Sequence, residues 1–296
     1  MSEIPIIDSH IHLFDGERPQ GATYMGSKAY AAISRVSLPE GYLRLAAPAG
    51  IVGAVVVESS GWVEDNLWYL EIAKDSPVVV GVVGRLDPTK PEFAEYLGRY
   101  AKNPLYRGIR TRGFFRTEGE RGVLVPDAVE RLKGLADADR ALDTANPSLP
   151  LLEADLRLAD AIPDLRIVID HLPGFDPPPD VLATYETLIR ELAARPNIFV
   201  KLSQVYHPGP DGAVSMAYEP IRARLDYLIA AFGEDRVMFG TDYPNSYGVA
   251  TIPQAVEVMK RFYGTRSRAA AEKYFWKNSA RVYKWIRRAP DQPDPM

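Results

Sequence analysis

The sequence contains no cysteine among its 296 residues. This absence excludes disulfide bonds, thiolate metal sites and a cysteine nucleophile. Long apolar runs are missing too, because stretches such as 78–83 are too short to span a bilayer. The N-terminus lacks a basic region followed by an apolar one, which is the pattern of a secretion signal. We therefore expect a cytoplasmic protein with no membrane partner.

An excess of positive charge is also missing, since the formal net charge at pH 7 is -4. Such a chain gives no support for a nucleic-acid partner or for binding to an anionic membrane. Hydrophobic residues make up 46% of the chain and charged residues 25%, which is ordinary for a folded protein with a sizeable core. We expect one domain over residues 1–296.

Short apolar segments alternate with helical patterns along most of the chain. The segments that indicate buried strands are 4–7, 51–57, 78–85, 105–110, 141–144, 165–171, 197–202 and 236–242. Between them apolar residues recur at helical spacing, as in 182–192. This alternation predicts a parallel sheet with right-handed crossovers, and eight units predict a closed (β/α)8 TIM barrel of the α/β class. A doubly wound open sheet is the alternative, but no Gly-rich phosphate loop follows any strand.

Two segments fall outside this alternation. Residues 13–50 form a long irregular stretch after the first strand, with a short helix expected at 39–45. Connections of this length often serve as lids, so we interpret 13–50 as a lid insertion; a mobile surface insertion is the alternative. From Pro290 onward, residues 290–296 are expected to form a frayed tail.

The first strand leads into two histidines separated by one residue, His10 and His12. Because strand side chains alternate faces, both imidazoles are expected to point into one pocket, where they can hold a metal or polarise a carbonyl. The alternative is two polar residues that only close a strand. The whole distribution of histidine decides between the two. The sequence has four histidines, and His171 and His207 also follow predicted strands, while Asp242 ends the last one. Catalytic groups of barrels come from these strand ends, so the pattern predicts an active site.

Three segments, 8–12, 169–174 and 239–244, resemble signatures of the amidohydrolase superfamily. The similarity is strongest to the amidohydrolase-2 branch, which contains sugar-acid lactonases and 2-pyrone-4,6-dicarboxylate lactonase. Further similar stretches at 81–87, 107–110 and 277–283 extend the resemblance over nearly the whole chain.

The resemblance implies roles for the polar residues at the strand ends. It makes His10, His12 and His171 catalytic, and Asp242 the group that activates water. One departure is the absence of histidine from 141–146, where metal-binding branches carry one, while strand four offers Arg110. A binuclear metal site is therefore not expected. Two options stay open, namely one divalent metal, zinc, on His10, His12 and Asp242, or a reaction that needs no metal.

This resemblance implies a hydrolase that opens the lactone of a sugar acid or dicarboxylic acid, in carbohydrate metabolism. Asp242 would take a proton from water while the histidines or a metal stabilise the oxyanion. The alternatives are a metal-dependent decarboxylase or hydratase of the same superfamily, and a non-catalytic barrel that binds a small acid. The expected partner is a small lactone or carboxylic acid. A homodimer is a further option that no stretch of the sequence marks.

Five residues are candidates for substrate binding. Arg110 offers a planar fork to a carboxylate, whereas Arg112 and Arg116 are interpreted as a solvated surface cluster. Tyr206 and His207 follow strand seven and can donate to hydroxyls or a carboxylate. Glu58 and Trp62 lie at the mouth of strand two, where a carboxylate beside an aromatic ring suits a sugar; core packing is the alternative for Trp62.

Overall fold

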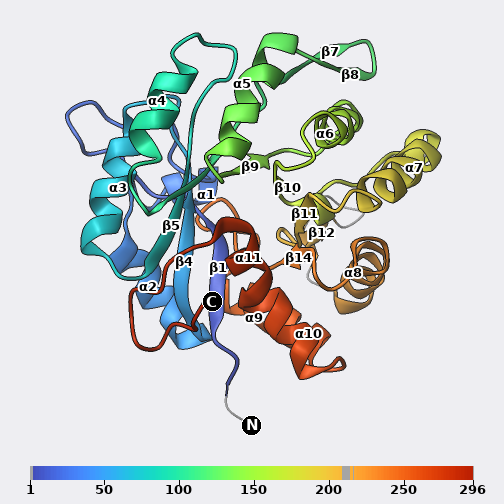
Figure 1. Ribbon diagram of the computed structural model, residues 1–296. Coiled ribbons are helices and arrows are strands. Elements are labelled where there is room, and N and C mark those ends of the chain that lie inside the picture. Colours follow the sequence, from blue (N-terminus) through green and yellow to red (C-terminus); the bar gives the residue numbers. More distant parts are fainter. Residues whose placement is uncertain (1–2, 209–213, 216, 296) are drawn as a thin grey trace.

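A closed parallel sheet forms the centre of the computed structural model, which describes residues 3–208, 214–215 and 217–295 (Figure 1). Its eight strands follow one another around the barrel in chain order. They are β1 (Ile6–Ile11), β4 (Ile51–Val57), β5 (Val79–Gly84), β6 (Tyr106–Arg110), β9 (Ala141–Thr144), β10 (Ile167–Ile169), β11 (Ile198–Lys201) and β14 (Val237–Met238). All eight predicted strands and the (β/α)8 architecture are confirmed.

The seam between the last and first strands closes the barrel. The backbone N–H of Ser9 donates to the carbonyl of Phe239 at 3.1 Å, and that of Asp242 donates to the carbonyl of His10 at 2.9 Å. A parallel bridge also joins Ile11 to Tyr243. These contacts bring the histidine-bearing strand β1 next to the loop that carries Asp242.

Helices surround the sheet in the same order as the strands (Figure 1). They are α3 (Asp65–Asp75), α4 (Phe93–Tyr100), α5 (Pro126–Asp137), α6 (Leu149–Ala161), α7 (Leu182–Ala193), α8 (Tyr218–Phe232), α9 (Ile252–Tyr263), α10 (Arg268–Glu272) and α11 (Asn278–Tyr283), with a π-helical turn η4 (Lys273–Lys277) before α11. Short 3-10 turns lie at η1 (Ala47–Ala49), η2 (Leu172–Gly174) and η3 (Pro179–Val181). Local signals set the helix starts: Thr251 and Gln254 form a capping box at α9, which has a proline in its first turn.

Two apolar layers follow from the alternation of strand side chains. Outward-facing strand residues pack against the helices in the larger layer. Inward-facing residues such as Val57, Val168 and Met238 fill the barrel with residues of α11 and with Trp285. Lys201 of β11 also has a fully buried side chain, and its contacts are inside the barrel.

The insertion 13–50 has regular structure of its own. It contains a small hairpin of β2 (Phe14–Asp15) and β3 (Val36–Ser37), helix α1 (Lys28–Ala31) and helix α2 (Pro39–Ala46). The predicted helix at 39–45 is confirmed by α2. Two further hairpins extend other loops, β7 (Phe115–Glu118) with β8 (Arg121–Leu124), and β12 (His207–Pro208) with β13 (Val214–Ser215).

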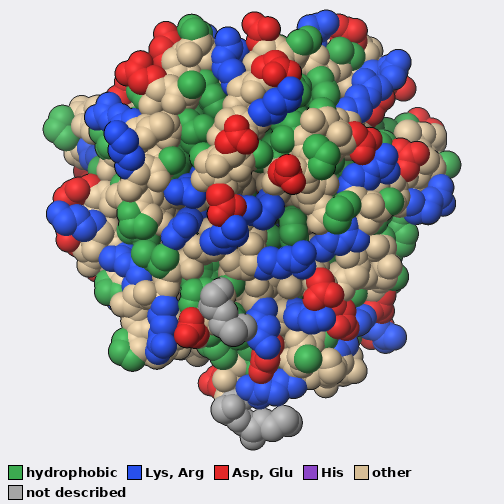
Figure 2. Space-filling view, in the orientation of Figure 1, with side chains coloured by type: hydrophobic (Ala, Val, Ile, Leu, Met, Phe, Trp, Pro, Cys, Tyr) green, Lys and Arg blue, Asp and Glu red, His purple; other side chains and the backbone are tan. Residues whose placement is uncertain are grey.

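The C-terminal segment lies against the N-terminal ends of the strands. Gln292 is buried, and its side-chain amide donates to the carbonyls of Val52 and Pro77 at 2.9 Å each. The prediction of a frayed tail is therefore wrong at Gln292, because these carbonyls precede or begin strands and need donors. Figure 2 shows the face that carries this segment: positive and negative side chains intermingle there, and no histidine colour is visible. Among the described residues, no helix combines the length and apolarity needed to cross a membrane.

Candidate active site

After each of four consecutive strands of the sheet, a non-glycine residue adopts a left-handed backbone conformation. Asn146, His171, Gln204 and Asp242 follow β9, β10, β11 and β14 with φ of 59°, 57°, 54° and 57°. Non-glycine residues adopt this conformation at a cost, and such residues cluster at functional sites. The repeated turn marks one end of the barrel as the place where polar side chains are gathered.

A cavity of about 690 Å³ opens at this end of the barrel. Its walls come from the ends of seven strands and the loops that follow them, and from the insertion after β1, and they are mostly polar. The lining residues are Thr23, Tyr24, Glu58, Ser59, Ser60, Gly61, Arg85, Asp87, Arg110, Thr111, Arg112, Gly113, Ala145, Asn146, His171, Gln204 and Asn245. A cavity of this size and polarity suits a small hydroxylated or acidic molecule.

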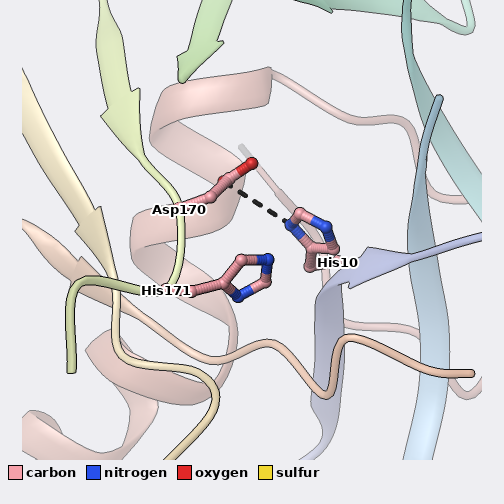
Figure 3. Close-up of side chains that lie close together, drawn as sticks. All are labelled: His10, Asp170 and His171. Carbon is pink, nitrogen blue, oxygen red and sulfur yellow. Dashed lines mark ion pairs between the residues drawn. The ribbon is translucent and has the colours of Figure 1, made fainter. Parts of the chain in front are cut away.

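Three histidines converge on one carboxylate oxygen beside this cavity. Oδ1 of Asp242 lies 3.2 Å from Nε2 of His12 and 3.6 Å from Nε2 of both His10 and His171. Nε2 of His10 is 3.2 Å from Nε2 of His12. Figure 3 shows His10 on β1 facing His171 and Asp170 at the end of β10. The predicted pairing of the two strand-one histidines in one pocket therefore matches the geometry.

Asp242 is fully buried, yet its surroundings favour the ionised form. Gln204 Nε2 donates to Oδ2 at 2.6 Å and Asn245 Nδ2 donates to Oδ1 at 3.2 Å. Burial acts to raise the pKa of Asp242, but His171, His12 and His10 lower it by more, so that this pKa lies well below its ordinary value. The carboxylate is thus available to accept a proton.

For His10 and His171, burial favours the neutral form. Burial, followed by the charge of Lys201, lowers the pKa of His10 well below 6.5. Burial also lowers the pKa of His171, against the opposite effect of Asp242. His171 Nδ1 lies 2.6 Å from the hydroxyl of Ser203, which fixes its ring.

Arg110 ends β6 between the cavity and the histidines. Its Nε donates to Glu58 Oε1 at 2.9 Å, and its Nη2 donates to the backbone carbonyl of Glu58. Its remaining nitrogen, Nη1, lies 3.5 Å from His10 Nε2 and 4.0 Å from Asp170 Oδ2. Burial opposes the charge, but Glu58 and Asp170 together raise the pKa of Arg110 above its usual range. The Nε and Nη2 donors of the Arg110 guanidinium group are therefore already bonded to Glu58.

The other predicted binding residues are distributed unevenly around the site. Glu58 lines the cavity, as does the exposed Arg112. Trp62 lies outside the lining with 38% of its surface exposed. Tyr206 borders two small separate cavities, one near Pro173 and one near Leu202 and Phe239. Arg116, which the sequence indicates to be a solvated surface residue, is exposed on β7 and pairs with Glu118. The side chain of His207, the remaining candidate, lies outside the described part of the structure.

Several cavity residues carry no signal in the sequence. Gln204, Asn146 and Asn245 are ordinary amides in loops, and only the fold brings two of them onto Asp242. The insertion contributes Thr23 and Tyr24, which line the cavity. It is tethered there by Arg18, whose two terminal nitrogens donate to the Asp65 carboxylate at 2.9 and 3.1 Å.

Three buried residues form a set of donors of the kind that zinc takes. His10, His12 and Asp242 offer ligand atoms within 4.8 Å of one another, and all three residues are buried. His12 Nε2 lies 3.2 Å from Asp242 Oδ1, a distance that suits a proton or a cation between the two atoms. These residues fit one zinc ion by position, provided that His10 Nε2 presents a lone pair.

Comparison with known proteins gives concordant results. The model of the Amidohydro_2 family, described as amidohydrolase, matches residues 7–285. An L-fucono-1,5-lactonase of Burkholderia ambifaria is 30% identical over an alignment that covers 97% of this chain and 98% of the relative. An L-fucono-1,5-lactonase of Burkholderia multivorans is 27% identical over 93% of this chain and 94% of its own length.

Solved structures show the same fold at lower identity. A zinc-bound amidohydrolase of Burkholderia multivorans has a TM-score of 0.79 at 23% identity, covering 95% of this chain and 100% of the other. A Pseudomonas putida protein proposed to be a 2-pyrone-4,6-dicarboxylic acid hydrolase has a TM-score of 0.69 at 20% identity, covering 96% of this chain and 98% of the other. The 2,6-dihydroxybenzoate decarboxylase of Rhizobium reaches 0.65 at 16% identity over 96% and 99%.

Proposed function

The chain belongs to the amidohydrolase family, and on that premise we propose that it is a hydrolase that opens the lactone of a sugar acid or dicarboxylic acid. One observation carries the proposal: the buried carboxyl group of Asp242 lies against three histidines beside a polar cavity of about 690 Å³. The likeness to two lactonases supports the reaction class. Enzymes of this family act on small molecules, in keeping with the size of the cavity.

Lactone opening transfers an acyl group to water, and the site offers a base for that step. Asp242 takes one proton from a water molecule as the water oxygen forms a bond to the lactone carbonyl carbon. Once on Oδ1, this proton lies beside the acceptor Nε2 of His12, 3.2 Å away. The electron pair of the carbonyl double bond moves to the carbonyl oxygen and produces a tetrahedral oxyanion.

Donors around Asp242 then stabilise the oxyanion. We assign this role to His10 and His171, with Arg110 contributing through Nη1. When the tetrahedral intermediate collapses, the bond between the carbonyl carbon and the ring oxygen breaks. The ring oxygen takes the proton from Asp242, which leaves a hydroxy acid and the regenerated carboxylate. Glu58 and Arg110 bind polar groups of the substrate at the cavity wall.

A zinc ion is the second way to stabilise the oxyanion. It would be held by His10, His12 and Asp242, and it would polarise the lactone carbonyl. Metal content of the purified protein, with lactonase activity before and after chelation, separates the two cases. If activity survives the removal of all metal, protein donors alone stabilise the oxyanion. If activity is lost when one zinc ion is removed and returns when zinc is added, the metal stabilises the oxyanion.

A panel of aldonolactones and a 2-pyrone dicarboxylate, followed by proton release, tests the reaction class. Asp242→Asn is expected to lower turnover by about 10²- to 10⁴-fold, because the variant lacks the base, while circular dichroism and the melting temperature stay close to those of the parent. Asp160→Asn, which changes an exposed carboxylate paired with Arg195, is the matched control and keeps full activity. Unchanged turnover in Asp242→Asn contradicts the assignment. If the protein decarboxylates an aromatic acid and opens no lactone, the proposed reaction class is wrong and the protein is a decarboxylase.

A further inference from the structure

Beneath the catalytic histidines lies a buried lysine that the reaction above does not use. Lys201 Nζ donates to Asp143 Oδ2 at 2.6 Å, forms an ion pair with Asp170 Oδ1 at 3.0 Å and contacts His10 Nδ1 at 3.1 Å. The side chains of all four residues are fully buried. Nζ thus faces two carboxyl groups, a setting that suits an ammonium group, and an ammonium group can only donate. His10 Nδ1 must therefore accept.

The other nitrogen of His10 then carries the proton. The ring orientation is fixed because both nitrogens face polar atoms, Lys201 at Nδ1 and His12 at Nε2. A proton on Nδ1 would face the ammonium group at 3.1 Å, with two donors opposed and no acceptor between them. Its one other neighbour, Asp170 Oδ1, is 3.5 Å away and is already paired with Lys201. Neutral His10 is accordingly protonated on Nε2.

His12 has the opposite arrangement. Its Nδ1 lies 2.9 Å from the backbone carbonyl of Val57, which can only accept, so Nδ1 of His12 carries a proton. Neutral His12 therefore presents a lone pair on Nε2, 3.2 Å from Nε2 of His10. The two histidines thus carry their protons on opposite ring nitrogens, and in each ring the group that faces Nδ1 fixes the tautomer.

We propose that Lys201 is a positioning residue that holds His10 as an Nε2–H donor, so that the two histidines of strand β1 have opposite roles. His10 donates into the site, and His12 accepts. A zinc ion that took Nε2 of His10 as a ligand would have to move the His10 proton to Nδ1, against the ammonium group of Lys201. Lys201 thus disfavours a metal at His10. The role of His10 as a donor to the oxyanion rests on the proposed lactonase function. The position of the proton on the His10 ring does not depend on that function.

The tautomers are directly measurable in the unmodified protein. Long-range ¹H–¹⁵N NMR spectra of histidine-labelled protein distinguish protonated from unprotonated ring nitrogens, and His10→Asn and His12→Asn variants assign the signals. The expected result at neutral pH is Nε2–H for His10 and Nδ1–H for His12, with the His10 pattern unchanged when Zn²⁺ is added. An Nδ1–H pattern for His10, with or without Zn²⁺, overturns the proposal.

Two variants then test the role of Lys201 itself. Lys201→Met removes the ammonium group, and His10 is expected to shift to the Nδ1–H tautomer, because Asp170 Oδ1 becomes its nearest acceptor. Tyr283→Phe is the matched control: it removes a 2.9 Å hydrogen bond to Asp143 from the same buried cluster but leaves Lys201 against His10. The control is expected to keep the parental tautomer. A parental tautomer in folded Lys201→Met would contradict the proposal, and should that variant not fold, the spectra of the unmodified protein decide.

Kinetics separate this inference from the proposed reaction. If the protein opens lactones, Lys201→Met is expected to lower kcat by about tenfold or more with little change in KM, because an oriented oxyanion donor is lost. If the unmodified protein has no lactonase activity, the proposed function is wrong and the tautomer result is unaffected. If the unmodified protein is active and Lys201→Met has the same kcat, His10 does not act as an oxyanion donor positioned by Lys201.

Discussion

Glu58 and Arg110 form a buried pair at the cavity wall, in which Arg110 Nε donates to the Glu58 carboxylate at 2.9 Å and Nη2 donates to the Glu58 backbone carbonyl. Only 8% of the Glu58 side chain and 15% of the Arg110 side chain are exposed. A substrate carboxylate would therefore meet an arginine whose charge is already offset. The pair has a direct consequence for substrate choice.

We expect an uncharged aldonolactone to be opened faster than a lactone that carries carboxylates. Glu58→Gln keeps an oxygen acceptor for Arg110 Nε but removes the negative charge, so KM for a 2-pyrone dicarboxylate should fall by about tenfold, an ion-pair effect of roughly 1.4 kcal/mol. KM for an aldonolactone should rise or stay constant. Steady-state kinetics on both substrates check this, with Glu118→Gln as the exposed control. A dicarboxylate KM that rises in Glu58→Gln contradicts the expectation.

The pH dependence of the reaction follows from the same groups. Burial lowers the pKa of His171 and of His10 below 6.5, and the pKa of Asp242 lies below 3.8. All three groups therefore hold their working protonation states above pH 6.5. We expect kcat/KM to be flat above about pH 6.5 and to fall only at lower pH, where a histidine gains a proton. Initial rates across this range test it, and an acid limb with its midpoint above 6.5 would be inconsistent with buried, neutral histidines.

Asp8 makes stability depend on pH in a predictable direction. This buried carboxylate accepts hydrogen bonds from Tyr42, from His10 and twice from Thr241, but burial outweighs them and raises its pKa from 3.8 to about 6. A raised carboxyl pKa means that the folded state binds more protons between these values, so the contribution of Asp8 to stability falls as pH rises from about 4 to about 6.

Asp8→Asn removes this pH-dependent contribution. The free energy of unfolding of the variant, relative to the parent, is expected to increase by about 3 kcal/mol between pH 4 and pH 7. Urea unfolding of both proteins at several pH values measures the difference. Parallel pH profiles for the two proteins would show that Asp8 has an ordinary pKa.

Arg18 is expected to control access to the cavity. It binds Asp65 through two hydrogen bonds, stacks 4.3 Å from the centre of the Trp68 ring and contacts the carbonyl of Gly21. The next residues of the same loop include Tyr24 at the cavity wall. Arg18→Ala should therefore raise KM by about three- to tenfold with a smaller change in kcat, since loop closure acts mainly on binding.

The control for this prediction is Arg116→Ala, which removes another loop arginine that pairs with an exposed glutamate. The melting temperature of Arg18→Ala is also expected to fall, because Asp65 is left buried without its partner. An unchanged KM in a variant whose melting temperature does fall would show that the loop does not govern substrate binding.

Much of the barrel was predictable because its signals are local. Each of the eight strands is a short apolar segment between helical patterns, and the (β/α)8 closure follows from their number. The proximity of His10, His12, His171 and Asp242 was predictable, since parallel strands end at one rim. The tail was not, because the burial of Gln292 depends on carbonyls more than 200 residues away.

The sequence by itself determined which residues stand at the strand ends, because side-chain alternation and chain order are local properties. Only the tertiary structure decided what those residues face. Arg110 is paired with Glu58, Gln204 and Asn245 hold Asp242, and Lys201 reaches His10 from another strand. These pairings join residues that no local pattern connects, and proton positions and available charges in the site depend on them.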